Sequence, residues 1–160
     1  METVALVIQD LAGIEARYGE IFEATMIVQQ ALEHKHPEDV LAALAQRETL
    51  LQSLEDRWIL LRQHEADLLT VCGCGGEEFN LSLLKRHLPE AEYHSLTVRL
   101  SRIEEVLVQI LAADEANQED ATLLQEGIKL ELSRLQSVKT VMRAYGSFAG
   151  AEPRFIDKNR

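Results

Sequence analysis

The feature that most constrains this chain is an apolar repeat whose spacings alternate between four and three residues. It begins at Leu96 and continues without a slip to Tyr145, through Leu100, Ile103, Leu107, Ile110, Asp114, Asn117, Ala121, Leu124, Ile128, Glu131, Leu135, Val138 and Met142. Such spacing places one narrow stripe, here called the seam, along a helix that packs against other helices. We therefore expect one helix over about residues 90–144, roughly 80 Å long at 1.5 Å per residue.

Two earlier stretches show the same alternation and predict helices over about residues 2–33 and 37–70. The first seam is Val7, Leu11, Ile14, Tyr18, Ile21, Thr25, Val28 and Leu32, and the second is Val40, Leu44, Arg47, Leu51, Leu54, Trp58, Leu61, Glu65 and Leu68. Pro37 suits the first turn of the second helix, and the glycines of CGCGG (72–76) end it. Asn80 is placed to cap a short helix over about residues 80–87, before Pro89.

These elements predict an all-α fold. We expect an extended antiparallel three-helix bundle or coiled coil with one short extra helix, forming a single helical domain over residues 1–144. The remaining residues, 145–160, mix glycine, proline, aromatic and basic residues and predict an irregular C-terminal tail. Residues 134–160 hold six basic side chains against two acidic ones, in a chain whose net charge is −11.

Three polar residues, Asp114, Asn117 and Glu131, interrupt the seam of the third helix. Polar residues in a coiled-coil core often fix the register of the helices at some cost in stability. They can also mark the point where the partner helices end and the long helix continues by itself. The sequence leaves both interpretations open.

Composition and charge narrow the class of function. An acidic chain is unsuited to nucleic acid or to anionic membrane surfaces. No apolar run of about 18 residues predicts a membrane-spanning helix, and METVALVIQD lacks the basic start of a secretory signal. We expect a cytoplasmic protein. No phosphate loop, dinucleotide fingerprint, nucleophile elbow or HExxH motif is present, so we expect neither an enzyme nor a cofactor.

Two cysteines raise a metal or redox alternative. Cys72 and Cys74 form a CxC pair, which His64 and His87 could complete as a two-cysteine, two-histidine site. The spacing is not that of a typical zinc or thioredoxin-like motif. A glycine-rich turn that carries two small thiols is the simpler interpretation.

The stretch NQEDATLLQEGI (117–128), followed by AYGSFAG (144–150), resembles the C-terminal half of FlgN-type flagellar export chaperones. Members of that family carry an Asn-x-x-Asn element before a Leu-Leu pair and, further on, a Tyr-Gly element. Here Asn117 matches the first asparagine, Leu123 and Leu124 match the leucine pair, and Tyr145 and Gly146 match the Tyr-Gly element. Asp120 replaces the second asparagine.

The resemblance implies a chaperone that binds disordered C-terminal segments of hook-associated (hook–filament junction) proteins and delivers them to the flagellar export gate. It implies that the last helix captures cargo and that the Tyr-Gly region docks on the gate. The residues expected to bind these partners are Asn117, Leu124, Ile128, Leu135, Val138, Met142, Tyr145, Gly146, Phe148 and Phe155. Tyr145 could equally pack as the last seam residue on the end of the bundle.

Two alternatives to the chaperone stay open. One is a structural coiled coil that oligomerises permanently through its seam, and a homo-oligomer fits the repeat. The other is a metal- or redox-responsive helical regulator that uses Cys72 and Cys74.

Overall fold

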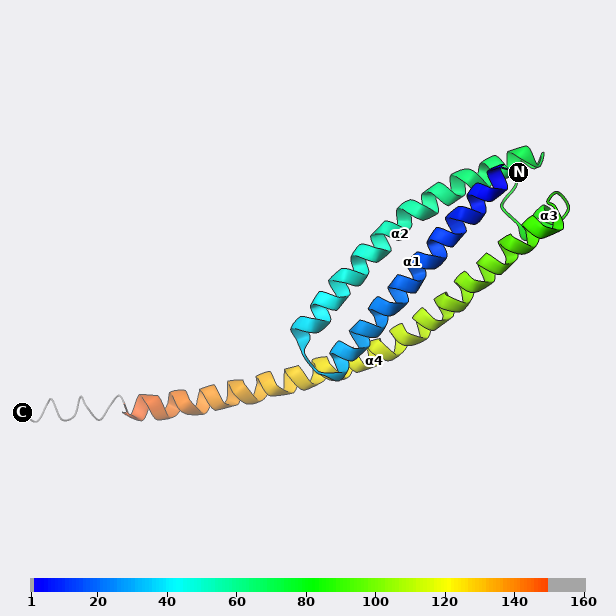
Figure 1. Ribbon diagram of the computed structural model, residues 1–160. Coiled ribbons are helices and arrows are strands. Elements are labelled where there is room, and N and C mark those ends of the chain that lie inside the picture. The colour runs from blue at the N-terminus through cyan, green and yellow to red at the C-terminus, as the bar shows by residue number, and fades with distance from the viewer. Residues whose placement is uncertain (1, 150–160) are drawn as a thin grey trace, which may run out of the picture. The chain divides into compact units, whose positions relative to one another are not determined.

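A computed structural model describes residues 2–149 of the chain, with side chains as far as Gly146, and within that range it contains helices and no strands (Figure 1). The helices are α1 (Glu2–Glu33), α2 (Pro37–Val71), α3 (Leu81–Leu84) and α4 (Glu90–Ala149). The predicted all-α, bundle-like fold with three long helices and one short one is therefore confirmed. No helix among the described residues has the length and apolarity needed to cross a membrane.

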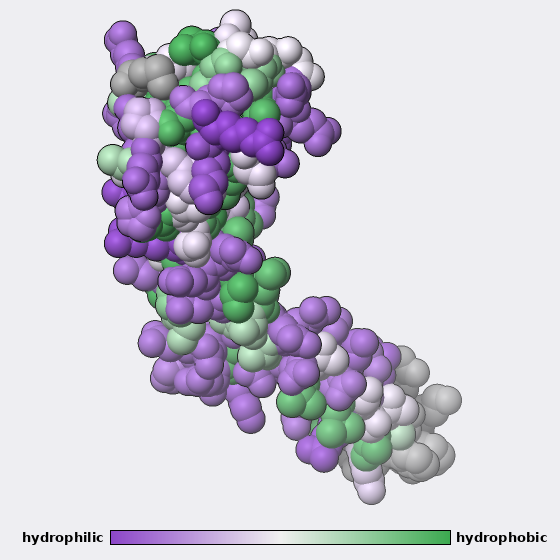
Figure 2. Space-filling view, turned by 90° about the vertical axis from the view of Figure 1, so that its right-hand side faces the viewer, coloured by the Kyte–Doolittle hydropathy of each residue, from purple (hydrophilic) through white to green (hydrophobic). Residues whose placement is uncertain are grey.

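The chain divides into two compact units, and the boundary falls inside α4. The first unit ends at Gln118 and contains α1, α2, α3 and the first part of α4. Within it, α1, α2 and that part of α4 lie side by side (Figure 1). The second unit begins at Glu119, and its described part is the remainder of α4. In Figure 2 the surface of this helix, at the lower right, carries apolar patches between polar ones.

Local signals explain where the helices begin and end. Pro37 occupies the first turn of α2 and is followed by Glu38 and Asp39, which favour the positive end of the helix dipole. Lys35 turns the chain between α1 and α2 with a φ of 55°. The Oδ1 atom of Asn80 accepts a hydrogen bond of 2.8 Å from the backbone N–H of Ser82, as predicted for a cap.

The short helix is smaller than predicted. It spans Leu81–Leu84 rather than residues 80–87. After Leu84 the backbone N–H groups of Arg86 and His87 bond to the carbonyls three residues earlier, at 3.2 and 3.0 Å. These tighter turns replace the second turn of an α-helix ahead of Pro89.

The last helix is longer than predicted, because α4 continues through Gly146 to Ala149 instead of ending at residue 144. Gly127 also lies inside α4. A glycine weakens a helix by about 1 kcal/mol relative to alanine, which is too little to end a helix whose neighbours favour it. Of the predicted tail, residues 145–149 belong to α4, and residues 150–160 lie outside the described range.

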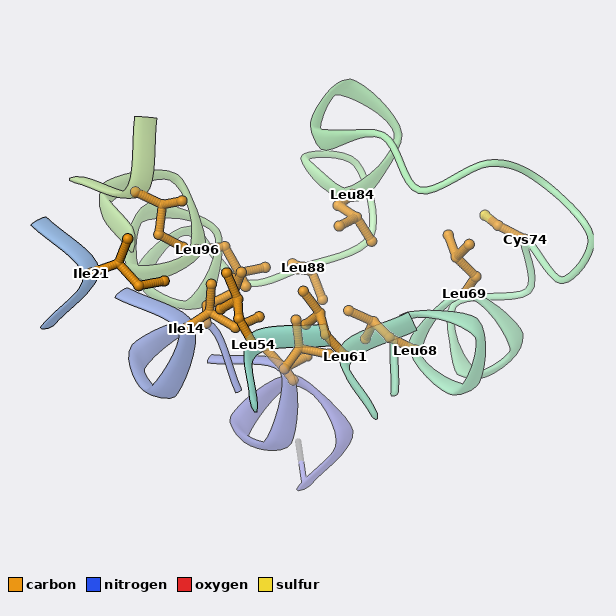
Figure 3. Close-up of a cluster of buried hydrophobic side chains, with 14 of the residues drawn as sticks. Ile14, Ile21, Leu54, Leu61, Leu68, Leu69, Cys74, Leu84, Leu88 and Leu96 are labelled. Carbon is orange, nitrogen blue, oxygen red and sulfur yellow. The ribbon is translucent and has the colours of Figure 1, made fainter. Parts of the chain in front are cut away.

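The core of the first unit lies between its three long helices. In Figure 3, side chains such as Ile14 of α1, Leu61 of α2 and Leu96 of α4 point toward one another. Nearly all of the seam predicted for α1 is buried, and Tyr18 is partly buried. In α4 the buried residues up to Asn117 are Leu96, Ile103, Ile110 and Asn117, all of them predicted seam positions.

The buried stripe is broader than a two-helix seam at several places. Ala24 and Ala31 of α1 and Leu69 of α2 are also buried, since each helix of a three-helix bundle faces two neighbours. One predicted position is wrong. Leu44 is 42% exposed, and Ala43 is buried in its place, so near its start α2 faces the core one residue earlier than the strict repeat predicts.

A layer of four polar side chains closes the seam where α4 leaves the first unit. Thr25 of α1 is fully buried, and its hydroxyl accepts a hydrogen bond of 3.0 Å from Nε of Arg47 in α2. A second nitrogen of Arg47 lies 2.5 Å from a carboxylate oxygen of Asp114 in α4. The side-chain amide of Asn117 donates to the backbone carbonyl of Thr25 at 3.2 Å. We call these four residues the polar layer.

The polar layer joins all three long helices, and each of its members occupies a predicted seam position. A hydrogen-bonded layer in an apolar seam fixes the register, because sliding one helix would leave buried polar groups without partners. Both interpretations of Asp114 and Asn117 therefore hold in part. They fix the register, and they mark the end of the covered part of α4.

We predict that Asp114→Ala lowers the free energy of unfolding by about 1–3 kcal/mol, because it removes the carboxylate from the mostly buried guanidinium of Arg47. Chemical denaturation followed by circular dichroism measures the change. The control is Glu115→Ala, an exposed acid next in the chain. Equal effects of the two substitutions would show that the polar layer contributes nothing to stability.

Glu65 is a half-buried acid at a predicted seam position of α2. Burial raises the pKa of its carboxyl above the ordinary value of 4.5, and nearby Arg62 opposes the rise. Above pH 4.5 the folded chain therefore keeps a proton that the unfolded chain has released. The folded state binds more protons there, so this residue makes stability fall as pH rises through that window.

Glu65→Gln should accordingly raise the melting temperature at pH 8 and have little effect near pH 4, where both states hold the proton. Thermal unfolding at a series of pH values provides the measurement. Glu55→Gln, at an exposed position of the same helix, is the matched control. A gain from Glu65→Gln that is the same at every pH would contradict the assignment.

Candidate partner-binding face

Beyond the polar layer, the side chains of α4 change from buried to exposed. Asn117 is 6% exposed, and from Gln118 to Gly146 every described residue is exposed except Leu124, which is partly so. The large apolar side chains in this range other than Leu124 have exposed fractions between 38% for Ile128 and 73% for Tyr145. We call the apolar side chains of residues 119–146 the C-terminal face.

The C-terminal face continues the four-three seam. Leu124, Ile128, Leu135, Val138, Met142 and Tyr145 keep the alternation that packs the earlier part of α4 into the bundle. At this spacing they form one stripe along the helix. A stripe of this kind would contact a single amphipathic helix along its length.

Further apolar residues lie beside the stripe. They are 53–65% exposed and are not among the predicted partner-binding residues: Leu123, Leu130, Leu132 and Val141. Strict four-three spacing selects one residue per turn and so omits these four. Four further large apolar residues on an otherwise polar helix segment were nevertheless a sequence signal of a wider contact surface. Large apolar surfaces that remain exposed commonly mark interaction sites.

Charge is distributed unevenly along the face. Glu119, Asp120 and Glu126 precede its midpoint, and Arg134, Lys139 and Arg143 follow it. At the midpoint, Glu131 occupies a seam position and forms an exposed ion pair of 3.2 Å with Arg134. An exposed pair of this kind stabilises a helix little. Its significance is that it partly neutralises the one acidic residue within the apolar stripe.

The structure brings together most of the predicted partner-binding residues but separates Asn117 from them. Asn117 is buried in the polar layer and bonds to Thr25, so its amide acts within the first unit. Tyr145 lies at the far end of the described face and Gly146 follows it within α4. The side chain of Phe148 and all of Phe155 lie outside the described residues.

The cysteines lie at the other end of the first unit. Cys74 is buried, and its sulfur lies 3.5 Å from Nε2 of His87. His64 is engaged elsewhere, with Nδ1 at 2.5 Å from a carboxylate oxygen of Asp10. Burial, and then the neighbouring Cys74, raise the pKa of the Cys72 thiol, which disfavours the reactive thiolate. Among the described residues, no group of three or more His, Cys, Asp or Glu side chains is arranged to hold a metal ion.

A groove of about 880 Å³ lies between the segment that joins α3 to α4 and the first turns of α4. Its lining includes Lys85, Leu88, Tyr93, His94 and Thr97. None of the predicted partner-binding residues borders it. The C-terminal face, which holds most of the predicted partner-binding residues, is therefore the candidate site.

Comparisons with protein-family models, curated proteins and solved structures found no match to this chain.

Proposed function

We propose that the chain is a FlgN-like flagellar export chaperone. It acts in the cytoplasm, binds disordered C-terminal segments of hook-associated proteins and delivers them to the export gate. The observation that carries the proposal is the C-terminal face, a coiled-coil seam that continues along α4 past Asn117 with most of its apolar side chains exposed. The two motifs, NQEDATLLQEGI (117–128) and AYGSFAG (144–150), supply the link to this class of chaperone.

The face has suitable chemistry for transient capture of an unfolded segment. A disordered cargo segment with its own apolar stripe would fold as a helix along Leu124, Ile128, Leu135 and Met142, and the apolar burial would offset the entropy lost on ordering. Binding that includes such a folding cost is modest in affinity for its area and reversible. A chaperone that must release its cargo at the gate requires both properties.

Tyr145 is the residue proposed to contact the gate. It is the most exposed of the large apolar and aromatic side chains from Leu123 to Gly146, and tyrosine is among the residue types enriched at binding hot spots. Its place at the end of the described face leaves the preceding stripe free for cargo.

Titration of the full chain with peptides from the C-terminal segments of hook-associated proteins tests cargo binding. We expect Leu135→Glu to weaken binding at least about tenfold, because it puts a charge in the middle of an apolar contact. The matched control is Ser133→Glu, which adds the same charge on the opposite side of the helix and should change affinity less than about twofold. No detectable binding at about 1 mM would contradict the proposed cargo class.

Tyr145→Ala separates the two proposed partners. We expect it to weaken binding to the export-gate protein while leaving the affinity for cargo peptides within about twofold of the unsubstituted chain. An unchanged far-ultraviolet circular dichroism spectrum and melting temperature would establish that the variant is folded. Loss of cargo binding together with gate binding would contradict the division of roles.

A further inference from the structure

The charges on the second half of α4 are separated along its length. Residues 119–131 contain four acids and one lysine, a net charge of −3, whereas residues 132–146 contain three basic residues and no acid, a net charge of +3. Besides Lys129, the charged residues of this range are, in chain order, Glu119, Asp120, Glu126, Glu131, Arg134, Lys139 and Arg143. The helix is thus acidic at one end of the C-terminal face and basic at the other.

This separation discriminates between the two ways in which two copies of the face can pair. A parallel pair places acidic against acidic and basic against basic, which is unfavourable. An antiparallel pair places the acidic half of each copy against the basic half of the other. The face is therefore electrostatically complementary to itself in the antiparallel orientation.

The seam residues also match in that orientation. In an antiparallel coiled coil, the two kinds of seam position face each other. Centring the pair at Ser133 places Leu124 opposite Met142 of the second copy and Ile128 opposite Val138 of the second copy. It also brings the largest side chain of the stripe, Tyr145, opposite the smallest, Ala121.

Glu131 faces Leu135 of the second copy in this register and keeps its ion pair with Arg134 of its own chain. A register shifted by one heptad toward the N-terminus would place Met142 opposite Asn117, which is buried in the polar layer and cannot take part. A shift of one heptad in the other direction would place Leu124 opposite the last residue of α4 in the second copy. Ala121 would then lie past the end of that helix. The register centred at Ser133 therefore covers the most apolar surface.

We propose that, in the absence of another partner, the C-terminal face is covered by a second copy of this chain, paired antiparallel over residues 119–146 in the register centred at Ser133. The inference concerns the chain alone and does not depend on the proposed chaperone function. A cargo helix would have to displace the second copy from the same stripe.

Sedimentation equilibrium of the full chain over a range of concentrations tests the pairing. The chain should associate to a dimer that Leu135→Glu weakens at least about tenfold, because two carboxylates then face each other at Glu131. Glu131→Leu should tighten the dimer at least about tenfold by making that layer wholly apolar. Ser133→Glu lies away from the stripe and serves as the control for added charge.

Both seam substitutions are at exposed positions of α4, so the melting temperature of the first unit should not change. A chain that is monomeric at every concentration, with Glu131→Leu also monomeric, would overturn the proposal. So would a dimer of the unsubstituted chain that Leu135→Glu and Glu131→Leu leave unchanged.

Disulfide trapping tests orientation and register. In a Cys72→Ser, Cys74→Ser background, Leu124→Cys chains mixed with Met142→Cys chains should form a mixed disulfide faster than either forms a disulfide with itself. Faster self-linkage of Leu124→Cys would indicate a parallel pair and overturn the proposal. Ser133→Cys is the control: Ser133 lies on the side of the helix opposite the stripe, so this variant should form disulfides slowly whether the pair is antiparallel or parallel.

Discussion

The structure depends on one constraint, that the apolar seam of a helix has to be covered by other helices. Along α4 the covering changes at a defined place. Up to Asn117 the seam is buried or partly buried within the first unit, and beyond it the same four-three pattern continues on side chains that are exposed, apart from the partly exposed Leu124. Burial of such side chains stabilises the first unit, whereas their exposure in the second makes that segment a surface for association.

The polar layer lies between the buried part and the exposed part of the α4 seam. Hydrogen bonds link Arg47 to Thr25 and Asp114, and Asn117 to the backbone carbonyl of Thr25, so three helices are joined and the alignment of α4 with α1 and α2 is set. An apolar layer at the same place would permit neighbouring registers that differ by a heptad. By fixing the alignment, the polar layer also fixes which residues of α4 are buried and which remain on the C-terminal face.

Much of the fold could be predicted from the sequence, because helix periodicity is a local property. The seams of α1 and α4 identified the core residues, and Pro37 and Asn80 marked two helix starts. The end of α4 was misplaced, because the composition of residues 145–160 predicted an irregular segment, whereas the helix continues to Ala149. Leu44 was misplaced because the repeat describes a seam between two helices, and a bundle of three presents a wider and locally shifted stripe.

The candidate site was predictable only in part. The repeat identified the stripe from Leu124 to Tyr145, but it could not distinguish a covered seam from an exposed one, since that depends on where α1 and α2 end in space. For the same reason Asn117 was grouped with the partner-binding residues although it bonds within the bundle. The pairing of Arg47 with Thr25 and Asp114 could not be predicted, because it depends on the register of all three long helices relative to one another.

The proposed cargo capture and the proposed self-pairing make the same demand of α4, an exposed apolar stripe that a second helix can cover. The segregated charges add direction to that surface, since a helix that is basic at one end and acidic at the other would be favoured in one orientation. A cargo segment that competes successfully would therefore be expected to combine an apolar stripe with acidic residues near the end that meets Arg134, Lys139 and Arg143.

Hydrogen–deuterium exchange along α4 tests the central claim most directly, because amide protection reports which part of the helix is held by tertiary contacts. At low concentration without partners, we predict strong protection for residues 90–117 and much faster exchange for residues 119–146. Protection of residues 119–146 should then rise as the concentration is increased or cargo peptide is added, with residues 90–117 unchanged. Equal and strong protection along the whole helix in dilute solution would contradict the account.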